Sequence, residues 1–118
     1  MDIRVKRAYE QPDSSDGTRV LVDRVWPRGV RRQEAELAEW LKEIAPSSDL
    51  RKWFNHDPDK WQDFMEKYCR ELDGRPELVQ KLVALAAKGP LTLVFAAKDR
   101  EHNNAVVLRR YLQKLEDG

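Results

Sequence analysis

Two short stretches of the chain are rich in apolar, strand-forming residues, and they predict the central strands of a sheet. They are Val20–Val25 and Leu91–Ala97, and the second follows the breaker pair Gly89-Pro90. Strands that are covered on both faces have nearly continuous apolar runs, whereas half-exposed strands alternate between apolar and polar residues. Because a long helical segment separates the two stretches, we expect parallel strands whose carboxyl ends lie at the same edge of the sheet.

The N-terminal stretch alternates instead. Ile3 and Val5 are separated by Arg4 and followed by Lys6, which predicts an edge strand with one wet face. The turn-rich segment 11–17 that follows is shorter than the dozen or so residues, roughly, of a helical crossover. It therefore forms either a hairpin or a compressed crossover, and the orientation of the first strand stays open.

In the middle of the chain the apolar residues recur every three or four positions, which predicts helices. The pattern at 37–44 places a helix that Pro46 ends, and Ser47 or Ser48 can cap a short helix that runs to Phe54. The large aromatic residues fall on the inner faces of the predicted helices, where they are more often core than a platform for nucleic-acid bases. We therefore predict these core anchors: Trp40, Trp53, Trp61 and Phe64.

Three longer helices should follow. One begins after the N-cap Asp57 and ends at Gly74, Pro76 opens the next, and Asn103 or Asn104 caps the last. The length of 118 residues is enough to bury one core without disulfides or a structural metal, and no linker or repeat divides the chain. We expect a single α/β domain over residues 1–118, a small three-layer sandwich in which helices cover both faces of a largely parallel sheet of about three or four strands.

The charges nearly cancel, because 22 basic residues face 21 acidic ones and leave a net charge of +1. This balance argues against wholesale wrapping of nucleic acid and leaves only local patches to interpret. The one cysteine, Cys69, lies in an amphipathic run and is interpreted as a structural thiol. No apolar run is long enough to span a bilayer and the N-terminus has no basic-then-apolar leader, so we expect no membrane partner and a cytoplasmic location.

Two polar corners follow the predicted central strands and should face each other across one crevice. The first combines arginines, which bind anions with two parallel hydrogen bonds, with a flat indole and a carboxylate. Its residues are Asp23, Arg24, Trp26 and Arg28. Further along the same loop, Arg31 and Arg32 are expected to face water or to pair with Glu34 and Glu36.

The second corner lies between the last strand and the last helix, a usual ligand position in open α/β sheets. An imidazole titrates near cellular pH, so His102 suits general acid–base chemistry, with a structural helix-capping role as the equal alternative. The other histidine, His56, is interpreted as structural. The second corner holds Lys98, Asp99, His102, Asn103 and Asn104.

Several common catalytic and cofactor motifs are absent from the sequence. It has no Walker loop, no GxGxxG fingerprint and no serine-centred elbow. Its two histidines are far apart and lack a cysteine cluster, so no zinc site is expected. We therefore predict neither a metal nor a cofactor.

Four separated blocks of the chain resemble the YeaO-like family, a bacterial and archaeal branch of a larger family of unknown function. They are VLVDRVWPRGV, WLKEIAPS, LRKWFNHDP and LVFAAKDREHNNAVVL, and together they span nearly the whole sequence. Broader members carry a Cys-His-Arg corner after the last strand, where this chain has Glu101-His102-Asn103, so chemistry that needs the cysteine is not implied. The resemblance implies an α/β fold and a polar crevice, and it carries over no activity.

Two functions from different classes remain open. In the first, the crevice binds a small anionic molecule, a nucleotide or phosphorylated metabolite, with Arg24 and Arg28 as anion donors. His102, Asp23 and Asp99 are the candidate catalytic residues in this hypothesis, although the sequence does not decide whether any turnover occurs. In the second, the loop Arg24–Arg32 binds nucleic acid or an acidic partner without catalysis.

A purely structural outcome is also open for the same residues. Asp23 could pair with Arg24, and Asp99 with Lys98, in a salt-bridge network that needs no ligand.

Overall fold

A computed structural model describes residues 1–117. In this part of the chain, one sheet has the strand order β1-β4-β2-β3, and every neighbouring pair is parallel. The strands are β1, Ile3–Arg7; β2, Thr18–Leu21; β3, Glu39–Trp40; and β4, Leu91–Phe95. Val20 lies opposite Leu93, so the predicted parallel pairing of the two central stretches is confirmed. The carboxyl ends of β2 and β4 therefore lie at the same edge of the sheet.

Both central strands are shorter than predicted, because a side chain replaces the main-chain ladder at their ends. β2 ends at Leu21 rather than Val25, and Val25 is 61% exposed. The Val22 N–H still donates to the Val94 carbonyl at 3.0 Å, but the next main-chain donor on β4, the Ala96 N–H, donates to the carboxylate of Asp23 at 2.9 Å. The polar corner thus begins one residue after the last buried apolar position.

The first strand lies at an edge of the sheet, as predicted, and its connection to β2 is a compressed crossover rather than a hairpin. This connection contains the single-turn helix η1, Ser14–Asp16, whose N-cap is Asp13. Gly17 follows with a φ of 64°, and a Cβ at this position would collide with the Pro90 carbonyl. Only glycine fits this close approach without strain.

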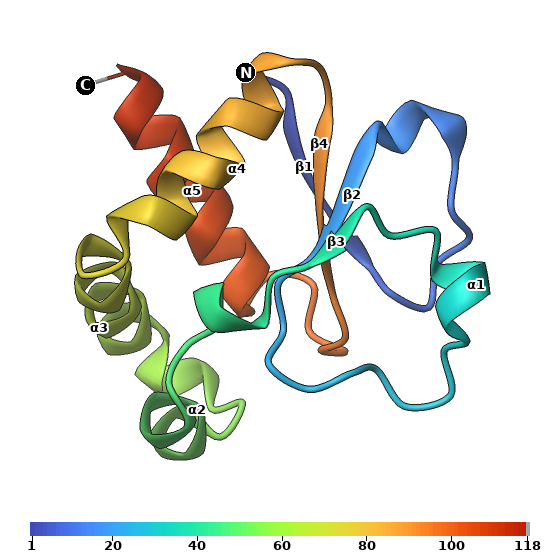
Figure 1. Ribbon diagram of the computed structural model, residues 1–118. Coiled ribbons are helices and arrows are strands. Elements are labelled where there is room, and N and C mark those ends of the chain that lie inside the picture. The colour runs from blue at the N-terminus through green and yellow to red at the C-terminus, as the bar shows by residue number, and fades with distance from the viewer. Residues whose placement is uncertain (118) are drawn as a thin grey trace.

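The longer helices lie together on one side of the sheet (Figure 1). Apolar residues on this face, including Val20, Leu93 and Phe95, join the helices in one buried cluster with Phe64 and Leu72. The predicted α/β sandwich with a parallel sheet is confirmed, and the layer on the opposite face consists of the shorter η1 and α1. The helices are α1, Arg32–Ala35; η2, Lys42–Ile44; α2, Ser48–Phe54; η3, Pro58–Lys60; α3, Trp61–Asp73; α4, Pro76–Ala87; and α5, Asn104–Asp117.

The helix predicted over 37–44 is wrong. The one-turn α1 ends before Glu36, which has a φ of 50°, and the chain then forms strand β3 and the single turn η2. Pairing with β2 satisfies this backbone, since the Leu41 N–H donates to the Leu21 carbonyl at 2.9 Å. Leu41 and Ile44 are buried in the main cluster, so their spacing mimics a helix although they belong to a strand end and a 3₁₀ turn.

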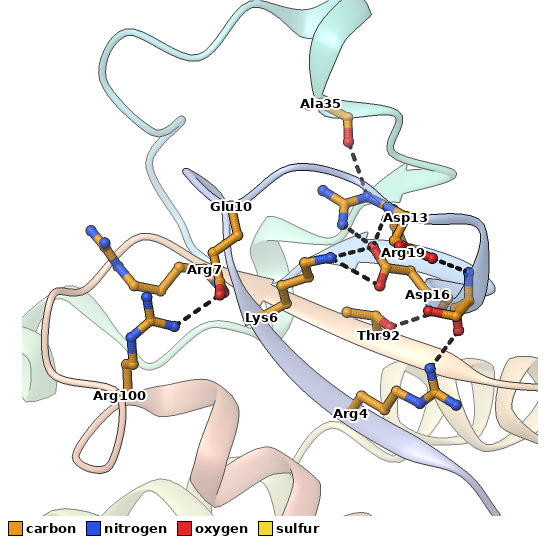
Figure 2. Close-up of polar contacts among 11 residues, drawn as sticks. Arg4, Lys6, Arg7, Glu10, Asp13, Asp16, Arg19, Ala35, Thr92 and Arg100 are labelled. Carbon is orange, nitrogen blue, oxygen red and sulfur yellow. Dashed lines mark hydrogen bonds and ion pairs between the residues drawn. The ribbon is translucent and has the colours of Figure 1, made fainter.

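The sheet face under η1 is polar, and a buried ion cluster holds it together (Figure 2). Arg19 and Thr92 lie side by side in the strand register, and both are buried. The Asp16 carboxylate accepts hydrogen bonds from Arg19 at 2.7 Å and from Lys6 at 3.1 Å, and the Thr92 hydroxyl donates to the Asp16 carbonyl at 2.7 Å. Charge-assisted bonds thus stabilise this part of the face, which also carries the buried apolar residues Leu21 and Val94.

Among the predicted core anchors, Phe64 is buried and Trp53 is not. Phe64 is 2% exposed, whereas Trp53 is 37% exposed and carries the ammonium groups of Lys60 and Lys67 over its ring, each at 5.1 Å. The prediction for Trp53 is wrong because Leu50 and Phe54, four residues apart, already form the buried side of the short α2. Trp40 and Trp61 are partly buried at the edge of the core.

None of the helices in residues 1–117 has both the length and the apolar composition that a bilayer crossing requires.

Candidate functional site

A cleft of about 910 Å³ opens at the carboxyl edge of the sheet. Its walls come from the segments after β2 and β4, the end of α2 and the start of α5. The structure brings every residue of the two predicted corners into its lining: Asp23, Arg24, Trp26, Arg28, Lys98, Asp99, His102, Asn103 and Asn104. The two corners therefore face one space, as the parallel pairing of β2 and β4 requires.

Asp23 lies in the wall of the cleft between the two strand ends. Its Oδ2 accepts the Ala96 N–H at 2.9 Å, and its Oδ1 accepts a hydrogen bond from the Asn104 amide at 3.2 Å. None of the ion pairs in residues 1–117 includes Asp23. Burial raises the pKa of the Asp23 carboxyl, and the hydrogen bonds from Ala96 and Asn104 offset this only in part.

Asp99 and His102 form a second polar pair. The Asp99 carboxylate accepts the main-chain N–H groups of Glu101 and His102 at 2.9 and 3.0 Å, and its Oδ2 lies 2.9 Å from His102 Nδ1. The Glu101 N–H and the imidazole both lower the pKa of Asp99. The imidazole and the Trp61 ring also pack in a T-shaped arrangement with their centroids 5.1 Å apart, which helps to orient the imidazole. With Nδ1 held by the carboxylate, Nε2 is the ring nitrogen left for a ligand.

The two asparagines mainly build the corner itself. Asn103 is buried, and its side chain accepts the Val106 N–H at 3.1 Å while donating to the Asp99 carbonyl at 2.9 Å. This confirms a helix cap at the predicted position. Asn104 donates to the Val22 carbonyl at 3.0 Å and so ties the start of α5 to the end of β2.

The salt-bridge network considered for this corner does not form in residues 1–117. Arg24 donates to the Ala45 carbonyl at 3.3 Å and lies 3.8 Å from Glu43, while its buried Nε has no hydrogen-bond partner in the described structure. Asp99 pairs with His102 rather than with the exposed Lys98. In residues 1–117, Asp23 and Asp99 therefore form no ion pair with an arginine of the cleft.

Sequence reasoning missed a third wall, which the C-terminal end of α2 provides. It contributes Arg51, Lys52, Asn55 and His56. Asn55 and His56 both have positive φ angles, 46° and 54°, which carry the chain sharply around the cleft. Two consecutive non-glycine residues in this region are uncommon and cost free energy, and such strain concentrates at functional sites. The cluster of polar residues after an amphipathic helix was the available signal.

Contacts distant in sequence hold this third wall in place. Ser47, the N-cap of α2, donates to the Glu71 carboxylate of α3 through its main-chain N–H at 2.8 Å and its hydroxyl at 2.6 Å. Arg75 donates to the Ala45 carbonyl at 2.6 Å from the same side. These bonds position α2 against α3, and hence its last turn against the strand ends.

Arg31 and Arg32, at the end of the Trp26–Arg32 loop, make their contacts outside the cleft. Arg32 lies over the rings of Trp26 and Trp40, at 4.7 and 5.5 Å from their centroids, and Arg31 lies 3.9 Å from Glu34. Neither lines the cleft. Trp26 donates from its indole N–H to the Val30 carbonyl at 2.8 Å, so it braces the loop while forming part of the cleft wall.

The described part of the chain contains no set of side chains suited to bind a metal ion. Within residues 1–117, no three histidine, cysteine, aspartate or glutamate side chains gather closely enough to hold an ion. Cys69 lies on α3 outside the cleft, and burial raises the pKa of its thiol, which disfavours the nucleophilic thiolate.

Comparison with known proteins gives the family. The model of a family described as "Inactive DUF488-N3 subclade" matches residues 2–117. The chain is 43% identical over 115 residues to "Uncharacterized protein YeaO" of Escherichia coli K12, which covers 98% of this chain and 100% of that protein. It is 38% identical over 110 residues to "Uncharacterized protein Rv3073c" of Mycobacterium tuberculosis H37Rv, with 93% and 92% covered. No solved structure matches. The chain therefore belongs to the YeaO-like branch of the DUF488 family, in the subclade described as inactive.

Proposed function

We propose that this chain is a binding protein for a small anionic molecule, a nucleotide or another phosphorylated metabolite, which it holds in the cleft without turnover. The observation that carries the proposal is the charge of the lining. Five cationic side chains face two carboxylates, Asp23 and Asp99, and His102 already engages the second of these. The cations are Arg24, Arg28, Arg51, Lys52 and Lys98.

The chemistry of these side chains suits a phosphate. An arginine donates two parallel hydrogen bonds to adjacent oxygens of a phosphate, and such charge-assisted bonds strengthen in a partly enclosed site. Arg24 has a buried Nε without a partner, so one of its donors is unused in residues 1–117. The Nε2 atom of His102 would add a further donor when the ring is protonated.

The residues of the corner after β4 support a role in binding without catalysis. Glu101 precedes His102 here, whereas broader family members that the sequence resembles have cysteine, so this chain lacks that nucleophile. The family description also calls the subclade inactive. The roles of Asp23, Asp99 and His102 are therefore proposed to be recognition and positioning.

The alternative of nucleic-acid binding through Arg24–Arg32 has less support. Two of its arginines already have partners within the chain: Arg31 forms an exposed ion pair with Glu34, and Arg32 lies over the indole rings of Trp26 and Trp40. Salt dependence separates the two functions, because backbone binding to DNA or RNA weakens steeply with ionic strength.

The test is calorimetric titration of inorganic phosphate, pyrophosphate and adenosine monophosphate into the parent and into Arg28→Ala and Arg51→Ala. Loss of one charge-assisted arginine contact should weaken binding by roughly tenfold or more. Arg31→Ala is the matched control, since it removes an exposed arginine from the same loop and should leave the Kd unchanged. Equal affinities in all four proteins, or no binding of any of the three anions, would exclude the cleft as an anion site.

A further inference from the structure

We infer that the anion bound in the cleft also carries a neutral hydrogen-bond donor, a hydroxyl or an amino group of a sugar or nucleobase, and that the Asp23 carboxylate accepts it. This inference rests on the proposed function and narrows its ligand to phosphate esters that bear such donors. It comes from one carboxylate whose surroundings leave part of its bonding capacity unused.

Asp23 has unused acceptor positions at the cleft. An ionised carboxylate offers about four such positions. In residues 1–117, Asp23 receives one bond from the Ala96 N–H and one from the Asn104 amide, and it takes part in no ion pair. Burying a carboxylate without a cation costs free energy. The two structural bonds occupy one position on each oxygen, so about two of the four positions stay open at the wall of the cleft.

The carboxylate is also held still. The Trp40 indole N–H donates to the main-chain carbonyl of Asp23 at 2.7 Å, and Asn104 bridges the Asp23 carboxylate and the Val22 carbonyl. These bonds fix the residue on both its main chain and its side chain. A group fixed in this way can accept a ligand donor with little reorganisation, which favours selective recognition.

The charge of the cleft decides what kind of donor Asp23 accepts. Arg51 and His56, which also line the cleft, act electrostatically on Asp23 from the end of α2. A positively charged group on the ligand would be repelled by the cationic lining, whereas a neutral hydroxyl or amino group would not. The fitting class is therefore a sugar phosphate or nucleotide rather than an amine-bearing zwitterion.

Matched pairs of phosphate esters test this on the parent protein. Glycerol 3-phosphate is compared with propyl phosphate, and ribose 5-phosphate with tetrahydrofuran-2-ylmethyl phosphate, so each pair differs in its hydroxyls. A site that hydrogen-bonds a hydroxyl rejects the analogue that lacks it, and we expect at least about a tenfold tighter Kd for the hydroxylated member of one pair. Inorganic phosphate serves as the bare anion.

The outcomes separate the two proposals. If inorganic phosphate and all four esters fail to bind, the anion site itself is excluded, and this inference with it. If the anions bind but both pairs show equal affinities within each pair, the anion site stands and the role of Asp23 is overturned.

Substitution of Asp23 provides an independent test of its role. Asp23→Asn should reduce the preference within the responsive pair to about twofold or less, because the amide is a weaker acceptor than a carboxylate. Asp63→Asn, the same change at an exposed position of α3 outside the cleft, should keep the full preference. Circular dichroism checks that each variant is folded. A folded Asp23→Asn protein that keeps the full preference would show that another group accepts the hydroxyl.

Discussion

The guanidinium of Arg19 lies 2.7 Å from the carboxylate of Asp16, on the sheet face opposite the long helices (Figure 2). Both side chains are almost fully buried, at 4% and 7% exposure. Arg19 also donates from Nε to the Ala35 carbonyl at 3.1 Å, so one side chain joins β2 to both η1 and α1. The ion pair therefore helps to hold the thin layer of η1 and α1 on this face of the sheet.

Replacing Arg19 with methionine should therefore destabilise the fold. The change leaves Asp16 buried with Lys6 as its remaining cation, and breaking a buried pair typically costs about 3 to 5 kcal/mol. Because Lys6 stays, we expect the lower end of that range in urea denaturation. Arg31→Met is the control, since the Arg31–Glu34 pair is exposed at 73% and 68%, and its loss should change stability by less than about 1 kcal/mol. Equal midpoints for the two variants would contradict a structural role for the buried pair.

Asp23 should make stability depend on pH in the direction opposite to an ordinary salt-bridged carboxylate. Burial raises its pKa in the folded state above the unfolded value of about 3.9. Ionisation is therefore less favourable in the fold, and the parent loses stability as the pH rises from about 4 through the folded-state pKa.

Asp23→Asn has no such titration. Its free energy of unfolding relative to that of the parent should therefore increase as the pH rises from about 4 towards neutral, measured by urea denaturation at each pH. A difference that stays constant with pH would show that the two states bind this proton equally. A gain in stability together with the loss of ligand discrimination would mark Asp23 as a functional acid.

Phe64 and Trp53, two of the predicted core anchors, should respond very differently to truncation. Phe64→Ala removes a ring that is 2% exposed and stacked on Phe54 at 4.2 Å, and it should cost about 3 to 5 kcal/mol. Trp53→Ala removes a ring that is 37% exposed and should cost clearly less, about 1 kcal/mol. Similar losses in chemical denaturation would refute the assignment of Trp53 to the surface.

His56→Gly should stabilise the protein and weaken anion binding in the cleft. The residue has a φ of 54°, where a side chain is strained and glycine is not. The strain relieved, about 1 to 2 kcal/mol, exceeds the entropic cost of glycine, about 0.5 to 1 kcal/mol. We therefore expect a gain of about 0.5 to 1 kcal/mol in the free energy of unfolding, together with weaker phosphate binding. Lys88→Gly, an exposed position at the end of α4 with an ordinary negative φ of −89°, should show no gain. A loss of stability in His56→Gly would mean that the imidazole contact with Phe54, at 6.4 Å, outweighs the strain.

The local sequence pattern predicted the elements that depend on residues close together in the sequence. The apolar runs at β2 and β4, the Ser47 and Asn103 caps and the proline and glycine helix boundaries were all readable in this way. Because the two strand ends share one edge in a parallel sheet, both polar corners of the cleft were readable as well.

What pattern could not predict depends on partners far away in the chain. The spacing at 37–44 fits a helix, and only the open edge of β2 makes it a strand. The end of α2 reaches the cleft because Ser47 bonds to Glu71, 24 residues later. The Asp16 cluster lies on a sheet face that the apolar helices do not cover. That face exists only in the assembled sheet.

The place of β4 in the sheet also bears on how the protein is made. β4 lies between β1 and β2, yet Leu91–Phe95 follows both of them by some seventy residues or more. On the ribosome, β1 has no partner in the sheet, and β2 has only β3, until this segment has left the exit tunnel. Pairing between distant segments also slows folding in general. The helices α2, α3 and α4, whose contacts are closer in sequence, can form first and present an apolar face that the nascent sheet covers last.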